Sequence, residues 1–276
     1  MRSHIILIYL TFLRYDLFTQ TQTIPMSYES VDANQKAGIA MLQYGDHDQA
    51  LSSFRRALLE IEQCVINASL EERRGSACRL HLEQPLSVEE QGIDTEHSGD
   101  VSTLISSVAL GDGELAESSF YNHAFVVGTL PTDYTRTPKE ESDHHVRLTT
   151  VLLFSMAMTF HKKGLLDGPM SLESLRKAIQ IYELVCMKMS LLSRPGYLED
   201  LYVIQLASWN NMGNIYSHLA ETEDAIRCRA LLHQALFEDT ALSLGLMYGY
   251  PYASFYLFVV CSEVRRRGFK ALSPEV

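Results

Sequence analysis

The sequence predicts an all-α protein in which antiparallel helix hairpins stack into a right-handed solenoid broken by one long irregular insertion. In three stretches the apolar residues recur at steps of three and four residues, which is the period of an amphipathic helix. Small residues lie at matched points of these stretches, and Gly38 precedes Ala50 by the same spacing as Gly213 precedes Ala225. The stretch between the first two hairpins is polar and acidic instead.

Composition limits the possible functions before any motif is considered. The 276 residues include 23 Lys and Arg against 34 Asp and Glu, which gives a formal net charge of −11, and 46% are hydrophobic. Nucleic-acid binding requires clustered basic side chains, as does docking to anionic lipid. We therefore expect no nucleic-acid or membrane partner, and a partner protein or peptide that is neutral or basic.

The first 25 residues form an atypical N-terminal extension. Arg2 precedes the apolar run 5–13, and a charge followed by an apolar run is the outline of a secretory signal. The small-residue cleavage pattern of such a signal is missing, and Met26 is an alternative start just before the helical patterning begins. We expect a soluble cytoplasmic or nuclear protein, with secretion left open by the apolar run.

Residues 32–66 are expected to form the first hairpin, with its turn at 44–48. The second helix of this hairpin has an apolar face with helical spacing, made of Ala50, Leu51, Phe54, Ala57, Leu58 and Ile61. A single hairpin cannot bury this face alone, so neighbouring hairpins must cover it.

Residues 83–147 lack the apolar spacing of a helix pair. The part from 86 to 99 is acidic, Gly111-Asp112-Gly113 is a turn signal, and 120–127 has the composition of a strand. We expect a polar, irregular insertion with room for one short β-hairpin.

The helical period returns at residue 148. We expect helices over 148–163 and 172–192, joined by a long turn that starts at Gly164. A third pair is expected over 197–219 and 224–244, with Gly245 as its stop, and the apolar stretch 252–264 as a capping helix.

Small residues face each other in all three pairs. The third pair contains Trp209-x2-Met212-Gly213-x2-Tyr216, and the second has an alanine at 157 in place of the glycine. Small side chains at the crossing of two helices let the axes approach, while aromatic residues fill the space around them. The full set of these positions is Gly38, Ala50, Phe54, Ala57, Ala157, Phe160, Ala178, Tyr182, Trp209, Gly213, Tyr216 and Ala225.

These positions resemble the tetratricopeptide repeat, a helix-turn-helix with the pattern Trp-x2-Leu-Gly-x2-Tyr followed by Ala-x3-Phe. Arg229, where the family prefers an aromatic residue, departs from the pattern. The segments 152–161, 177–182 and 210–216 are also similar to uncharacterised tetratricopeptide proteins of unicellular algae. That narrower resemblance implies an architecture and no activity.

The expected division of the chain follows from these patterns. It comprises the extension 1–25, the first hairpin 26–82, the insertion 83–147, the second and third hairpins 148–245, and the capping helix and tail 246–276.

The sequence contains no catalytic signature such as a nucleophile elbow, a zinc-protease motif or a phosphate loop. Cys78-x2-His81 has a metal-like spacing, but the second pair that a zinc site requires is absent. The five cysteines are scattered without a Cys-x-x-Cys pair, which indicates free thiols. We therefore expect no enzyme activity, no metal and no cofactor.

The resemblance implies a peptide-binding groove lined by the first helix of each pair. In the third pair the inward-facing candidates are Asn210, Asn214, Ser217 and His218. The alternative is that Asn210 and Asn211 only satisfy contacts within the fold. Carboxylate capture is not expected, because Gln35 and Ile39 of the first pair, and Val151 and Ser155 of the second, offer no cation.

The predicted function is a non-enzymatic scaffold or adaptor that binds a protein or peptide on the concave face. Two alternatives stay open. One is a structural subunit whose repeats form oligomers, and the other is an enzyme with a site in the insertion around His123, His144 and His145.

Overall fold

The computed structural model describes residues 28–79, 105–110, 121–127, 138–166, 171–191 and 199–237. The described part is mostly helical and has one small antiparallel sheet. Its elements are α2 (Tyr28–Gln43), α3 (His47–Arg79), β1 (Ile105–Ala109), β2 (His123–Val127), α4 (Pro138–Leu166), α5 (Ser171–Leu191), α6 (Glu199–His218) and α7 (Thr222–Phe237).

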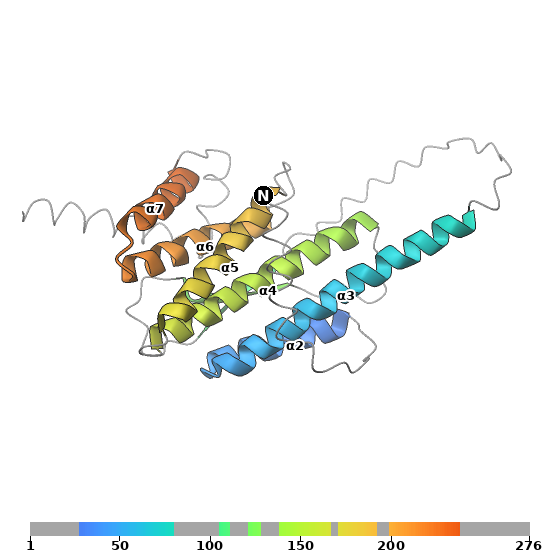
Figure 1. Cartoon of the computed structure of the whole chain (residues 1–276), viewed down its shortest axis with the longest axis horizontal. Helices are drawn as coiled ribbons and strands as arrows, with labels where there is room; N and C mark the ends of the chain where they lie inside the picture. Colours follow the sequence, from blue (N-terminus) through green and yellow to red (C-terminus); the bar gives the residue numbers. More distant parts are fainter. Residues whose placement is uncertain are drawn as a thin grey trace, which may run out of the picture.

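The helices pack in chain order. Each of α2 to α6 contacts the next helix along the chain, and α4 also contacts α2 and α6. Figure 1 shows this sequence of neighbours, from α2 and α3 through α4 and α5 to α6 and α7. No helix within the described ranges is long and apolar enough to cross a bilayer.

The first helix pair is present, but it starts at Tyr28 and ends at Arg79, beyond the predicted 32–66 at both ends. Its turn has a local cause. Gly45 has φ +78°, a left-handed conformation that glycine adopts without steric cost. Asp46 then caps α3, because its Oδ1 accepts a hydrogen bond from the Gln49 N–H at 3.2 Å. On α2, a Cβ added at Gly38 would lie 2.5 Å from a ring carbon of Phe54, so the ring packs directly on the glycine backbone.

Two bounds of α4 differ from the prediction. The helix begins at Pro138, so the last part of the expected irregular insertion 83–147 is helical. Proline suits the first helical position because a backbone N–H there would have no partner within the helix, so its absence costs nothing. The helix ends at Leu166, so Gly164 lies within it rather than in a turn. A Cβ at Gly164 would lie 2.7 Å from Leu175, which makes this glycine a point of close approach between α4 and α5.

The third pair begins at Glu199, close to the predicted start at 197. The turn between its two helices is tight. The Glu221 N–H bonds the Tyr216 carbonyl at 2.8 Å, and Ala220 takes φ 58°. A Cβ at Gly213 would lie 3.3 Å from the Cys228 Cβ, so α6 approaches α7 closely at this glycine, with Cys228 rather than the predicted Ala225 facing it. The extension 1–25, the stop at Gly245 and the capping helix 246–276 lie outside the described residues.

The predicted small and aromatic positions lie in the helix interfaces. All of them are buried except Trp209, which is partly buried and packs against the core. Phe54, Phe154 and Tyr182 are among the largest side chains that are fully buried.

The short β-hairpin expected in the insertion is present. β1 and β2 are antiparallel, with Ile105 opposite Val127 and Ala109 opposite His123. β2 packs against α4 and also contacts α2. The sheet is therefore part of the core, because Leu110, Tyr121, Ala124 and Phe125 are buried together with the helices.

Candidate functional site: a helical face that holds an extended strand

Residues 121–127 lie against the first helix of every pair. We call this segment the resident strand, and the surfaces of α2, α4 and α6 that touch it the strand-binding face. α2 contacts the strand through Gln35, α4 through Phe154 and α6 through Asn211. The first helices are the ones that the tetratricopeptide resemblance assigned to a concave groove.

The α4 part of the face binds the strand through aromatic packing. The ring of Phe154 meets the ring of Phe125 edge-on, with a distance of 5.1 Å between the ring centroids. It also meets the ring of Tyr121 edge-on, with a centroid distance of 6.5 Å. Tyr121 and Phe125 stack on each other at 5.5 Å. All three rings are buried, and such pairs add about 0.5–1.5 kcal/mol each beyond the buried area.

The backbone of the resident strand alternates between β1 and the helices. The Leu110 N–H donates to the Asn122 carbonyl at 3.2 Å, so even-numbered residues of the strand pair with β1. Odd-numbered residues, Tyr121 and Phe125 among them, therefore turn their N–H and C=O groups away from β1. These groups would be costly to bury without partners.

Side-chain amides of α6 and α2 provide those partners. Asn211 Oδ1 accepts from the Tyr121 N–H at 2.7 Å, and Asn211 Nδ2 donates to the Tyr121 carbonyl at 3.2 Å. Gln35 Nε2 donates to the Phe125 carbonyl at 3.3 Å. Both amide side chains have 0% exposure, so these bonds form away from water, where breaking them costs most.

Asn211 also joins the face to the second helix pair. Its Nδ2 donates to the Tyr182 hydroxyl at 3.0 Å. Burial raises the pKa of Tyr182 above its ordinary value, while the bond from Asn211 acts against that shift. Tyr182 therefore stays neutral and serves as a buried acceptor for the asparagine.

A buried histidine lies next to these groups on α4. Burial lowers the pKa of His161 to about 3, a hydrogen bond with Asn214 opposes the shift, and His218 adds to it. The ring meets Tyr182 edge-on at 6.3 Å. His161 is thus a neutral core residue at physiological pH.

The four predicted groove residues do not share one open surface. Asn210 is 2% exposed and its amide donates to Asn211 at 3.2 Å, so it is covered by the fold rather than open to solvent. Asn214 is half-buried beside His161. Ser217 and His218 are exposed, with the Ser217 hydroxyl bonded to the Gly213 carbonyl.

Sequence reasoning missed Asn211 and Gln35 as the residues that bind the strand. The sequence pattern places Gln35 on the inward face of the first pair but does not indicate a bond to the strand. A sequence window contains no signal for this role, because each amide bonds a residue 90 positions away.

The three histidines suggested for an enzymatic site belong to two elements, β2 and α4. His123 stacks on Tyr121 in the strand, at 5.1 Å between centroids. His144 is buried within α4, not in an irregular linker, and His145 follows it on the same helix. Within the described ranges, no three His, Cys, Asp or Glu residues are placed to hold a metal ion. His81 and the Cys78 side chain lie outside the described residues.

The half-buried thiol of Cys186 on α5 and the buried thiol of Cys228 on α7 are not activated. Burial raises the pKa of Cys186 to about 12 and that of Cys228 to about 11. A thiol reacts as its thiolate, so both groups are inert at neutral pH.

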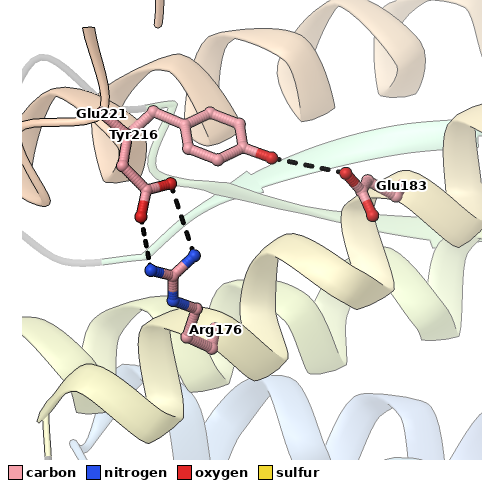
Figure 2. Close-up of polar contacts among 4 residues, drawn as sticks. All are labelled: Arg176, Glu183, Tyr216 and Glu221. Carbon is pink, nitrogen blue, oxygen red and sulfur yellow. Dashed lines mark hydrogen bonds and ion pairs between the residues drawn. The ribbon is translucent and has the colours of Figure 1, made fainter. Parts of the chain in front are cut away.

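Polar contacts on α5 connect the second pair to the third (Figure 2). The Arg176 guanidinium bonds both carboxylate oxygens of Glu221, which precedes α7. The Tyr216 hydroxyl of α6 donates to Glu183 Oε1 at 3.3 Å. These contacts help to hold α6, and Asn211 with it, against α5.

Comparison of the chain with protein-family models, with curated proteins and with solved structures gives no match. The function is therefore inferred from the contacts of this chain alone.

Proposed function

We propose that the chain is a non-enzymatic interaction module, in which three tetratricopeptide-like helix pairs form a solenoid whose first helices bind an extended segment. The neighbour-to-neighbour packing of α2 to α7 supports this architecture, as does the further contact between α4 and α6. In a solenoid each repeat contacts mainly its neighbours, and the surface along successive repeats is used for binding.

The observation that carries the proposal is the binding of the resident strand by all three first helices. Asn211 contacts the N–H and the C=O of a single residue, which is the pairing that an extended backbone requires. Recognition through the backbone does not depend on the side chain of the bound residue. The face is thus suited to extended segments as a class.

The charge of the resident strand agrees with a neutral ligand. The segment 121–127 reads Tyr-Asn-His-Ala-Phe-Val-Val, without Asp, Glu, Lys or Arg. On the face, Gln35, Phe154 and Asn211 are all uncharged. We expect charged residues in the central part of a ligand to be excluded, because they would lose hydration without gaining a partner.

Selection of displayed peptides on the full-length protein tests the proposal. Random peptides are selected on the wild type and then measured on Gln35→Ala and on Gln43→Ala. Gln43 is the matched control, because its amide also lies on α2 but donates to the Ala109 carbonyl of β1 at 3.1 Å. We expect selected peptides that lose affinity on Gln35→Ala and keep it on Gln43→Ala. Peptides that bind equally to all three proteins, or no selected peptides at all, would contradict the proposal.

A further inference from the structure

We propose that the resident strand is a displaceable occupant, and that a partner protein binds in its place through an extended segment with the pattern aromatic-x-x-small-aromatic-x-β-branched. This inference rests on the proposed function and deepens it, because it names the chemistry of the ligand. The pattern is that of the residues the face already holds.

The buried side chains of the resident strand define the pattern. Tyr121, Ala124, Phe125 and Val127 are each at most 4% exposed, whereas the three residues between them are half-buried. Ala124 has 0% exposure, so its position admits only a small side chain. The two aromatic positions are set by Phe154, whose ring meets both of theirs.

The contacts of the face with the strand do not depend on chain continuity. Gln35 and Asn211 reach Phe125 and Tyr121 across 90 residues of sequence, and the contact with Phe154 is between side chains. A segment of another protein with the same side chains and an extended backbone would meet the same groups. What favours the resident strand is its local concentration, which for a tethered segment is typically of millimolar order.

β1 is the most exposed partner of the resident strand. It has five residues, and Ser106, Ser107 and Ala109 of these are exposed. A two-stranded hairpin contributes little stability by itself. Weakening β1 therefore loosens the resident strand without altering any residue of the strand-binding face.

The alternation of the backbone supplies a matched pair of variants. The Ser106 N–H lies on the β2 side, since Ser106 pairs with Val126 in the even-numbered register, whereas the Ser107 N–H points away. Proline removes an N–H, so Ser106→Pro deletes a bond of the ladder. Ser107→Pro places the same ring at an equally exposed site and leaves the ladder intact.

The test measures binding of a fluorescein-labelled peptide with the sequence of residues 119–129 to the full-length variants. A peptide of the same composition in permuted order is the control. We expect Ser106→Pro to bind the ordered peptide about tenfold more tightly than the wild type or Ser107→Pro, because apparent affinity rises with the fraction of open face. Adding Asn211→Ala to Ser106→Pro should abolish that gain.

Three results would overturn the inference. The first is that the permuted peptide binds as tightly as the ordered one. The second is that the two proline variants bind the ordered peptide with equal affinity. The third is that Ser106→Pro forms a dimer by light scattering and binds no peptide, because the occupant of the face would then be a second copy of the chain. If peptides selected by display depend on Gln35 while the ordered peptide does not bind, the ligand pattern is wrong and the proposed function stands.

If the circular dichroism of Ser106→Pro shows that this variant does not fold, the inference is tested by amide exchange on the wild-type protein instead. Millimolar ordered peptide should then accelerate amide exchange of residues 121–127 in the chain at least severalfold, and the permuted peptide should not. Unchanged exchange with both peptides would overturn the inference.

Discussion

At the scale of single residues, the fold depends on positions with no room for an extra carbon. Gly38 supports the ring of Phe54, and Gly164 supports Leu175. The close packing at Gly38 was predictable, because Gly38 has the same spacing to Ala50 as Gly213 has to Ala225. The close packing at Gly164 was not, because a glycine near the end of a helical pattern is also the usual sign of a turn.

Gly38→Ala should lower the free energy of unfolding by about 1–2 kcal/mol, since overpacking costs about 1–3 kcal/mol and helix propensity returns up to about 1. Urea denaturation measures the change. In a Phe54→Leu background, where the ring is gone, the same alanine should no longer destabilise. An alanine that stabilises the otherwise wild-type protein would contradict the close packing of α2 on α3.

Asn211→Ala should destabilise the protein by about 2–4 kcal/mol, because it leaves the N–H and C=O of Tyr121 buried without their partner at about 1–3 kcal/mol per group. Thermal or urea unfolding measures this. The exposed Asn67 of α3 provides a control, and Asn67→Ala should change stability by less than about 0.5 kcal/mol. Equal effects of the two substitutions would mean that Asn211 does not hold the strand.

His161 should make the protein sensitive to acid. Its pKa of about 3 in the folded chain lies below the ordinary 6.5, so the unfolded chain binds a proton that the folded chain does not. Stability is complete above pH 6.5 and falls as the pH drops from 6.5 towards 3, by up to about 1.4 kcal/mol per pH unit from this residue.

Urea unfolding at pH 7.5, 6 and 5 measures that slope. His161→Gln should flatten it, whereas His233→Gln, at an exposed site on α7, should leave it unchanged. A slope that is the same in wild type and His161→Gln would show that His161 is not buried.

At the scale of elements, the described helices and the small sheet follow sequence patterns, and their bounds follow less closely. The strand composition of 120–127 identified β2, which forms over His123–Val127. The start of α4 at Pro138 was missed because its first turns are polar, and a polar run has the same appearance in a linker as on a solvated helix end. Periodicity shows where a helix packs and not where it begins.

Packing rather than ion pairing should hold the second pair to the third. Arg176 and Glu221 are 52% and 26% exposed, and exposed ion pairs contribute about 0–1 kcal/mol. A double-mutant cycle with Arg176→Ala and Glu221→Ala should therefore give a coupling energy below about 1 kcal/mol. A coupling of several kcal/mol would show that the ion pair in Figure 2 fixes the position of α6.

At the scale of the whole molecule, the described helices and the small sheet form one core. The sequence predicted the helices, since their spacing is local. It did not predict that residues 121–127 pack on the first helices. That placement depends on Asn211 and Gln35 meeting residues 90 positions away, which no periodic pattern encodes.

The position of residues 121–127 is tested most directly by amide hydrogen exchange on the unmodified full-length chain. If this segment lies across α2, α4 and α6, the amides of Tyr121 and Ala124 should exchange far more slowly than those of an unstructured peptide, and Asn211→Ala should release Tyr121 preferentially. Exchange of residues 121–127 at the rate of an unstructured peptide, with α4 still protected, would contradict the account.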